Sequence, residues 1–448
     1  MRALPRFAVA LLIAVIAVIV ATVRAGAGRD SDWFASDTRL SLRLEAPFNE
    51  LFAHAQQDGY AVRGSLIRTD AGSDRRIDNV KVTVRGNTSR RESECTFPKL
   101  KLSWNGGSLK VGTHCGESTG DDVTPKYGRL PNQTSPVREA FVYKLLALLG
   151  VPTLRARPAE ITYVYTDADE ERGSSITRNA FLLEDDEDAR ERLGATRTVS
   201  EEQFTNARDR FAPEATARIA FGEALIGNFD WCLRFSAGDR YRCDARHPLW
   251  NVLAFAWPDG TVRPLMYDFD VSGVVAGYHR WFGDIFNERF LPSRSEPAIE
   301  VTAQLQHARS LFDRGVLDAT RRAFAARKDV AYRALQESAV DGDGRKIFTA
   351  YMDAFFDAMT SDEVFYRPVV TAANTHVYAD AARTKPVCET VGALPIGTPV
   401  GDPIATRGGM MQVVVLDAMW KFAPPVKCAS IREKPVWIAK SAVGVDYP

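Results

Sequence analysis

A two-residue turn signal, Asp259-Gly260, constrains the centre of this chain more than any other local feature of the sequence. Apolar stretches flank the turn, so the segment is expected to form a β-hairpin. Counting outward along both arms places Asn251 opposite Asp268. Cross-strand partners have Cβ atoms about 4.5–5.5 Å apart, so an amide oxygen and a carboxylate are expected side by side at the open end of the hairpin. Such oxygen ligands suit Mg²⁺ or Mn²⁺.

A second carboxylate, that of Asp230, is expected near this pair, at the end of the apolar helix that precedes the hairpin. An Asp, then an Asn, then an Asp before a Phe is the polar set used in phosphoryl transfer. There, one carboxylate accepts the proton of the substrate hydroxyl, while the Asn and the last Asp hold the metal. Asp270 would either join the metal or cap the next turn. Each residue alone has an ordinary alternative, because Asp often caps a helix and Asn often begins a turn.

The residues around the hairpin resemble the spore-coat-protein-H (CotH) kinase-like family, and the similarity covers residues 75–335. The matching runs are Ile226–Trp231, Asn251 at the start of a strand, Asp268–Gly273, Val84–Ser89, Phe97–Leu102, Arg138–Lys144, Leu149–Pro152 and Asn179–Glu184. The resemblance implies a bilobal atypical protein-kinase fold of the α+β class. It also implies transfer of the γ-phosphate of ATP, with Mg²⁺ or Mn²⁺, to a Ser or Thr hydroxyl of an exported protein substrate.

In this resemblance Asp230 is the catalytic base, and Asn251 and Asp268 are the metal ligands. One departure concerns spacing, because the family's Asn follows its Asp closely, whereas Asn251 comes after an insert that contains Cys232 and Cys243. A disulfide between these two cysteines would close the insert and return Asn251 to the neighbourhood of Asp230.

Two strand lysines are candidates for contact with the nucleotide phosphates. Lys99 and Lys101 lie two residues apart, on one face of a strand, and nucleotide kinases place one strand lysine on the phosphates. Lys99, directly after Pro98, is the first choice and Lys101 the second. A solvated strand face is the alternative for either lysine taken alone.

The turn Gly86-Asn87-Thr88-Ser89 follows a strand of alternating valines and offers backbone N–H groups and hydroxyls that can hold phosphate. It is neither a P-loop nor a GxGxxG motif, so an ordinary hairpin turn is the alternative. The family resemblance implies that Arg85, Asn87 and Ser89 contact the nucleotide.

Glu139 and Glu184 are the remaining cofactor candidates. Glu139 lies in the predicted helix 136–149, where it either pairs with the strand lysine, as in a kinase, or occupies the first turn because the helix dipole favours an acid there. Glu184 follows the second of two predicted strands, 161–165 and 180–183, and begins an acidic run typical of solvated surface. The resemblance makes the backbone at this point a candidate adenine contact.

The six cysteines fall into three local couples: Cys95 with Cys115, Cys232 with Cys243, and Cys388 with Cys428. Six cysteines allow fifteen connectivities, and the local set is preferred because each couple flanks one loop or one small domain. No CxxC motif or histidine cluster indicates a zinc site. An exported protein can form such disulfides.

The first residues have the pattern of an export signal. Arg2 and Arg6 precede a continuous apolar run, 7–23, and the small residues 25–27 follow it. Residues 1–27 are therefore predicted to be a signal peptide, with an uncleaved membrane anchor as the alternative. In either case the rest of the chain is expected to be periplasmic or secreted.

The remaining chain is predicted to contain a kinase-like domain, 28–370, and a small all-β domain, 375–448. The short strands and Gly and Pro turns of the second domain resemble bacterial SH3-like domains, which bind cell-wall material or proteins. Lys and Arg together number 57, as do Asp and Glu, so the balanced charge does not indicate a nucleic-acid partner. The alternative to a kinase is a non-catalytic envelope or cell-wall binding protein on a pseudokinase scaffold.

Overall fold

The computed structural model describes most of the chain. The described residues are 33–68, 75–116, 133–168, 175–233, 243, 247–277, 297–387, 394, 396, 398, 400–401, 403–415 and 434–445. The predicted signal segment 1–27 and the predicted Cys388–Cys428 pair lie outside them. In this described part of the chain, no helix is both long enough and apolar enough to cross a bilayer.

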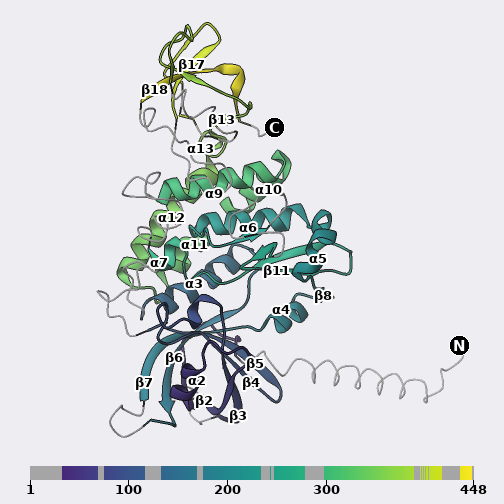
Figure 1. Ribbon diagram of the computed structural model, residues 1–448, viewed down its shortest axis with the longest axis vertical. Helices are drawn as coiled ribbons and strands as arrows, with labels where there is room; N and C mark the ends of the chain where they lie inside the picture. The colour runs from purple at the N-terminus through teal and green to yellow at the C-terminus, as the bar shows by residue number, and fades with distance from the viewer. Residues whose placement is uncertain are drawn as a thin grey trace, which may run out of the picture. The chain divides into compact units, whose positions relative to one another are not determined.

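The fold is mixed α+β and divides into two compact units (Figure 1). One unit contains the described residues up to Cys115 together with Arg155–Ala189, and the other contains Gly116–Leu154 and the chain from Arg190 onward. The chain thus enters the second unit twice, first through one helix and then through its larger part.

The first unit is built on a closed β-barrel with the strand order β1-β2-β3-β4-β5-β7-β6. Its strands are β1 (Leu40–Ala46), β2 (Ala61–Arg68), β3 (Arg75–Val84), β4 (Leu100–Trp104), β5 (Gly107–Gly112), β6 (Ala156–Tyr165) and β7 (Ser175–Leu183). β1 and β6 pair in parallel and close the barrel, while the other neighbours are antiparallel. Closure pairs the strand edges that an open sheet would expose.

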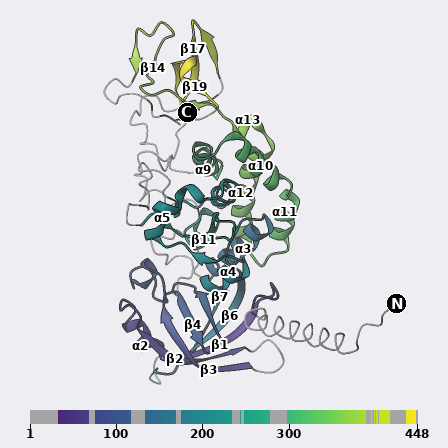
Figure 2. The same cartoon turned by 90° about the vertical axis from the view of Figure 1, so that its right-hand side faces the viewer.

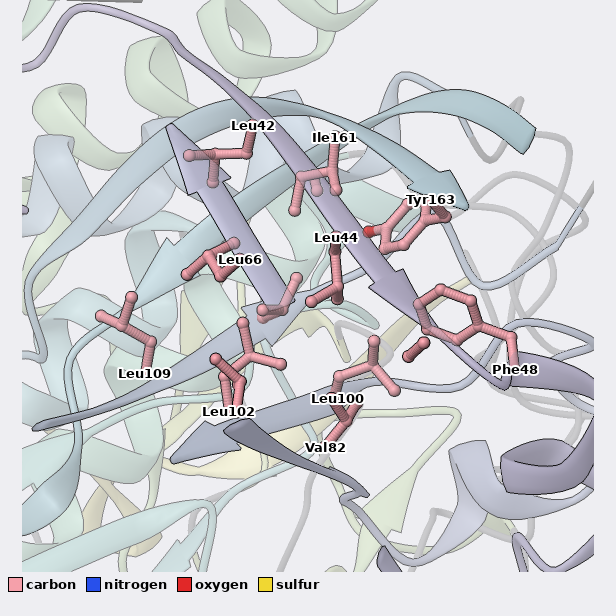
Figure 3. Packing of buried hydrophobic residues seen from close by; sticks show 14 of the residues in the cluster. Leu42, Leu44, Phe48, Leu66, Val82, Leu100, Leu102, Leu109, Ile161 and Tyr163 are labelled. Carbon is pink, nitrogen blue, oxygen red and sulfur yellow. The ribbon is translucent and has the colours of Figure 1, made fainter. Parts of the chain in front are cut away.

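Alternation along the strands places the core inside this barrel. Leu40, Leu42 and Leu44 share one face of β1 by the two-residue period of a strand, and all three are buried. Figure 3 shows Leu42 and Leu44 among side chains of other strands, including Leu66 and Leu102. Full burial of one such side chain stabilises the fold by about 1.5–3 kcal/mol.

A short helix and a disulfide complete the first unit. The helix α2 (Phe48–Ala53) packs Phe48 edge-on against Tyr163 of β6, with ring centroids 5.7 Å apart. The 3₁₀ helix η1 (Thr88–Arg90) lies in the connection between β3 and β4. Cys95 in the same connection is bonded to Cys115, after β5, with Cα atoms 4.6 Å apart, which confirms the predicted pairing.

The second unit is mainly helical, with small sheets. Its helices are α3 (Ser135–Leu148), α5 (Glu201–Ala207), η2 (Arg208–Arg210), α6 (Pro213–Leu225), α7 (Gly273–Ala276), α9 (Pro297–Leu311), α10 (Arg314–Ala325), α11 (Lys328–Gln336), α12 (Gly342–Thr360) and α13 (Asp362–Phe365), and α4 (Asp186–Arg192) spans the boundary between the units. Figure 2 shows α10 and α11 beside α12. Aromatic rings join α6, α10 and α12, since Phe221 lies 5.8 Å from Phe324, which lies 5.2 Å from Phe355.

The predicted hairpin and the segments around it contain five short strands. They are β8 (Arg197–Thr198), β9 (Cys232–Leu233), β10 (Leu249–Trp250), β11 (Val252–Ala256) and β12 (Val262–Met266). β11 is the centre of a three-stranded sheet, with β12 on one side and β8 on the other. β9 and β10 form a separate antiparallel pair.

The last part of the chain forms a five-stranded sheet with the order β15-β14-β18-β17-β16 and a two-stranded pair, β13 with β19. The strands are β13 (Val369–Val370), β14 (Val377–Tyr378), β15 (Pro386–Val387), β16 (Ala405–Arg407), β17 (Met410–Val414), β18 (Pro435–Ala439) and β19 (Val443–Gly444), and the 3₁₀ helix η4 is Lys440–Ala442. The switch to short strands after the helices confirms the predicted change of pattern. The SH3-like assignment remains a prediction.

Candidate functional site

The central hairpin is present, but its register differs by one residue from the prediction. Val252 pairs with Met266, and the N–H of Trp257 donates to the carbonyl of Thr261 across 2.9 Å. Three residues, 258–260, therefore form the loop, with Gly260 at φ +81°. A three-residue loop with a left-handed last residue is a common alternative to the two-residue turn. Asn251 consequently lies opposite Tyr267, whose N–H donates to its carbonyl at 3.2 Å, and the predicted Asn251–Asp268 pairing is wrong.

Asn251 and Asp268 nevertheless flank the same end of the hairpin. Both have a left-handed backbone, with φ of +54° and +67°. Outside glycine this conformation is uncommon, and Asn and Asp tolerate it best. Such residues concentrate at functional sites, where the surrounding structure holds them in place. These two residues with an uncommon backbone conformation are thus the same two that the sequence predicts as metal ligands.

Asp230 makes direct contact with Asn251. The Asn251 Nδ2 donates to the backbone carbonyl of Asp230 at 2.6 Å and to its Oδ2 at 3.1 Å. The other carboxylate oxygen, Oδ1, accepts a hydrogen bond of 3.1 Å from Nε1 of Trp250. Asp230 was expected at the end of a helix, but α6 ends five residues earlier, so it lies in a loop and does not cap that helix.

The loop that carries Asp230 is joined to the segment after Asp268. The N–H of Gly273 donates to the carbonyl of Gly227 at 3.1 Å. Tyr351 of α12 packs on both glycines so closely that a Cβ would come within 2.3 Å of its ring at Gly227 and 2.0 Å of its hydroxyl at Gly273. These contacts hold the Asp230 loop and the segment beyond Asp268 beside each other.

Backbone amides anchor Asp268 and the residue after it to helix α3. The N–H of Asp268 donates to the hydroxyl of Tyr143 at 3.0 Å, and the N–H of Phe269 donates to Oε1 of Glu139 at 3.3 Å. The buried ring of Phe269 lies 4.7 Å from that of Tyr143. Glu139 is buried in the second turn of α3, so its predicted place in the first turn, beside the helix dipole, is wrong.

The insert between Asp230 and Asn251 is closed as predicted. Cys232 and Cys243 form a disulfide, with Cα atoms 5.9 Å apart. Strand β9 then pairs with β10, so that Trp250 lies opposite Cys232. This arrangement returns Asn251 to Asp230 in spite of the long sequence between them.

Asp270 does not cap the helix that follows it. The N-cap position of α7 is Ser272, whose hydroxyl donates to the carbonyl of Phe269 at 2.7 Å. Asp270 is therefore not the N-cap residue of this helix. A metal-ligand role for Asp270 stays a prediction.

The predicted phosphate-binding lysines belong to the first unit. Leu100 and Leu102 of β4 belong to the barrel core, so alternation places Lys101 on the outer face, while Lys99 directly precedes the strand. Lys99 is buried, which excludes a solvated strand face for it. Lys101 is partly exposed and forms an ion pair of 2.5 Å with Asp185.

Sequence reasoning missed three residues around these lysines, namely Asp185, Ser108 and Lys110. The hydroxyl of Ser108 also donates to Asp185, at 2.6 Å. Burial alone would raise the pKa of the Asp185 carboxyl, but the hydrogen bonds from Lys101 and Ser108 outweigh burial and lower this pKa to about 2. Lys110 lies directly opposite Lys101 and is paired with Asp186. Burial lowers the pKa of Lys110, and the charge of Asp186 opposes this effect.

A turn signal could have located Lys110. The dipeptide Asn105-Gly106 is a strong hairpin turn. Counting outward from it pairs Trp104 with Gly107 and Lys101 with Lys110, which is the register observed. Trp250 was missed as well. It directly precedes Asn251 in the sequence, but nothing in the local pattern indicates that its indole reaches a carboxylate.

The loop after β3 contains three further candidates. The N–H of Arg85 donates to the carbonyl of Lys99 at 2.9 Å, which places this residue beside the lysine. Ser89 is buried and its hydroxyl donates to the carbonyl of Arg85 at 3.3 Å, so this hydroxyl closes the loop on itself. Asn87 is exposed, before η1, and its side chain makes no capping hydrogen bond there.

Glu184 is buried, and its solvated-surface interpretation is wrong. Its Oε2 accepts the N–H of Arg155 at 3.0 Å, and its own N–H donates to the Arg155 carbonyl at 2.9 Å. Asp185 is buried as well, so the acidic run begins inside the first unit rather than on its surface.

The donor atoms around Asn251 fit a hard cation by their chemistry. Across the described residues, no three His, Cys, Asp or Glu side chains are gathered as a metal site of those ligands alone requires. The residues here are an amide and aspartates, and Mg²⁺ is usually held by one or two carboxylates together with substrate phosphates. Because Asn251 turns its amide nitrogen to Asp230, its amide oxygen faces away from that carboxylate.

Comparison with known proteins adds little. No protein-family model matches the chain, and a search of curated proteins finds no match. The crystal structure of a Helicobacter pylori proinflammatory kinase, CtkA, matches with a TM-score of 0.32 and 9% sequence identity, over 62% of this chain and 95% of that one. A likeness at this TM-score assigns neither a fold nor an activity to this chain.

Proposed function

We propose that this chain is an exported atypical kinase that transfers the γ-phosphate of ATP to a Ser or Thr hydroxyl of a protein. The observation that carries the proposal is the Asp230–Asn251 contact beside the left-handed Asp268. Phosphoryl transfer needs a carboxylate that orients the attacking hydroxyl, together with oxygen ligands for a metal bound to the phosphates. These three residues supply both requirements within one unit.

Asp230 would accept the proton of the acceptor hydroxyl, because its carboxylate is held in a loop by hydrogen bonds and not engaged as a helix cap. Asn251 and Asp268 would hold Mg²⁺ or Mn²⁺, with Asp270 as a further ligand. When bound, the metal would neutralise charge on the phosphate oxygens of ATP. Lys99 or Lys101 would contact the phosphates, and Arg85, Asn87, Ser89, Glu139 and Glu184 are the remaining residues proposed for the nucleotide site.

The test uses the purified full chain with labelled ATP and Mg²⁺ or Mn²⁺. Label is expected on the chain itself or on a Ser-rich acceptor protein, and Asp268→Ala is expected to lower the rate at least 100-fold, on the order of the loss of one preorganised electrostatic group. Asp343→Ala is the matched control, because that carboxylate is exposed on α12 and pairs only with Lys346 in the contacts described.

Absence of transfer by the wild-type chain, or equal transfer by Asp268→Ala, would remove the proposal. Retention of the inactive protein on cell-wall material would then favour the binding-protein alternative.

A further inference from the structure

The two oxygens of the Asp230 carboxylate receive hydrogen bonds from two consecutive residues. Trp250 Nε1 donates to Oδ1 and Asn251 Nδ2 donates to Oδ2, each at 3.1 Å. An indole N–H can only donate, so its hydrogen bond holds Oδ1 of Asp230 at a fixed place in front of the Trp250 ring. Two donors, one on each oxygen, determine the plane of the carboxylate as well as its location.

Trp250 is held in this place by a very small sheet. Strands β9 and β10 contain two residues each, and they pair Trp250 with Cys232, two positions after Asp230. An isolated strand pair is marginally stable in water even when it is longer. The sheet therefore needs support from another part of the chain.

The Cys232–Cys243 disulfide supplies that support. Cys243 returns the chain to the start of β10, where its Sγ lies 3.3 Å from the carbonyl of Pro248. Both cysteines are buried, at 1% and 3% exposure. The covalent link thus joins the residue opposite Trp250 to the segment that leads into Trp250.

We infer that Trp250 is a positioning residue for the Asp230 carboxylate, and that the Cys232–Cys243 disulfide keeps Trp250 and Asn251 in place. The inference rests on the proposed function and adds a dependence on redox state. A dithiol reductant converts the disulfide into two thiols with two electrons and two protons, and is itself oxidised to a disulfide. The strand pair then loses its cross-link, and phosphotransfer falls.

The kinetic arm compares Trp250→Phe, which keeps a ring but removes the N–H donor, with the wild-type full chain. The expected result is a fall of about tenfold in kcat, the size of one hydrogen bond of about 1.4 kcal/mol, with KM for ATP changed less than twofold. Trp257→Phe is the matched control. The Trp257 ring packs on Arg263 of β12, near the hairpin loop, so this substitution is expected to leave kcat unchanged. An unchanged kcat in Trp250→Phe would overturn the inference.

The redox arm compares Cys232→Ala/Cys243→Ala with Cys95→Ala/Cys115→Ala, which removes the disulfide of the first unit. Only the Cys232→Ala/Cys243→Ala variant is expected to lose the further fall in kcat that dithiothreitol causes. A further fall in this variant as large as that in Cys95→Ala/Cys115→Ala would contradict the inference. This comparison also holds if Trp250→Phe does not fold.

A third arm does not depend on activity. Amide hydrogen exchange at Asp230 and Tyr267 should quicken in Cys232→Ala/Cys243→Ala and stay unchanged in the other double variant, because the amides of both residues donate within this region. If the wild-type chain transfers no phosphate but this difference appears, the proposed function fails while the positioning stands. Equal exchange in all three proteins would overturn the positioning.

Discussion

At the scale of single residues, the backbone explains why the polar residues near the hairpin are Asn and Asp. Asn251 and Asp268 both occupy the left-handed region, which β-branched or bulky residues enter only at a cost. The sequence identified both by their chemistry. It paired them wrongly because the length of a hairpin loop, two residues or three, decides the register of every pair beyond it.

The carboxylate of Asp185 offers a residue-scale prediction about stability. Its pKa is about 2 in the folded chain, below the ordinary value of 3.8, so its contribution is fully present above pH 3.8 and is lost as the pH falls towards 2. Asp185→Asn should lower the free energy of unfolding by about 1–2 kcal/mol at pH 7, allowing for partial solvent screening. Urea unfolding at pH 7 and pH 3 would measure this. A loss that does not shrink at the lower pH would contradict the assigned cause.

At the scale of elements, an ion pair between a buried arginine and a partly exposed aspartate joins α3 to the start of α12. The guanidinium of Arg138 is almost completely buried and donates from Nε and Nη2 to both oxygens of Asp341, at 2.8 and 2.7 Å. Asp341 also caps α12 by accepting the N–H of Gly344 at 2.9 Å. Burial acts to raise the pKa of Asp341, but the bonds from Arg138 and Gly344 outweigh it and lower this pKa to about 2.

Removal of Asp341 should cost more than removal of an ordinary cap. Asp341→Ala leaves the buried Arg138 without this carboxylate. Breaking a fully buried pair typically costs about 3–5 kcal/mol, and the partial exposure of Asp341 lowers the expected cost to about 2–3 kcal/mol. Asp313 caps α10 in the same way, by accepting the N–H of Val316 at 2.9 Å, and among the described contacts it forms no ion pair with an arginine. Asp313→Ala should therefore cost about 1 kcal/mol. Urea denaturation of both variants tests this comparison, and equal losses would show that Arg138 contributes nothing.

At the scale of the whole molecule, the disulfides Cys95–Cys115 and Cys232–Cys243 of the described residues indicate an oxidising environment, in agreement with the export signal expected from the sequence. Cys95–Cys115 spans 20 residues and encloses β4 and β5, the strands that carry Lys101 and Lys110. The hairpin that presents these lysines is thus closed by a covalent link at its open end.

Loss of the Cys95–Cys115 bridge should lower the free energy of unfolding by about 3 kcal/mol, as expected for a loop of this length. The comparison is between wild type and Cys95→Ala/Cys115→Ala by chemical denaturation without reductant. When both proteins are reduced with dithiothreitol, neither contains the bridge. The difference between their free energies of unfolding that is due to this bridge should then disappear. Equal stability of the two oxidised proteins would show that the unfolded chain gains nothing by losing the cross-link.

Elements with strong periodicity were predictable from the sequence. The helix 136–149 and the strands 161–165 and 180–183 were expected from their spacing and lie within or close to α3, β6 and β7, because alternation and helical spacing depend only on neighbours along the chain. The two described disulfides also followed, because each joins cysteines close in sequence. The prediction that Asp230 and Asn251 lie together rested on the family resemblance and on closure of the insert by the Cys232–Cys243 disulfide.

The closure of the barrel, the burial of Glu139 and Glu184, and the hydrogen bond from Trp250 to Asp230 could be known only from the three-dimensional structure. Each depends on groups far apart in the sequence, where periodicity carries no information. From the sequence, a carboxylate near a helix end or in an acidic run is expected to be exposed. In the fold, the N–H of Phe269 donates to Glu139 and the N–H of Arg155 donates to Glu184. Burial then becomes affordable in free energy because the charge is hydrogen-bonded.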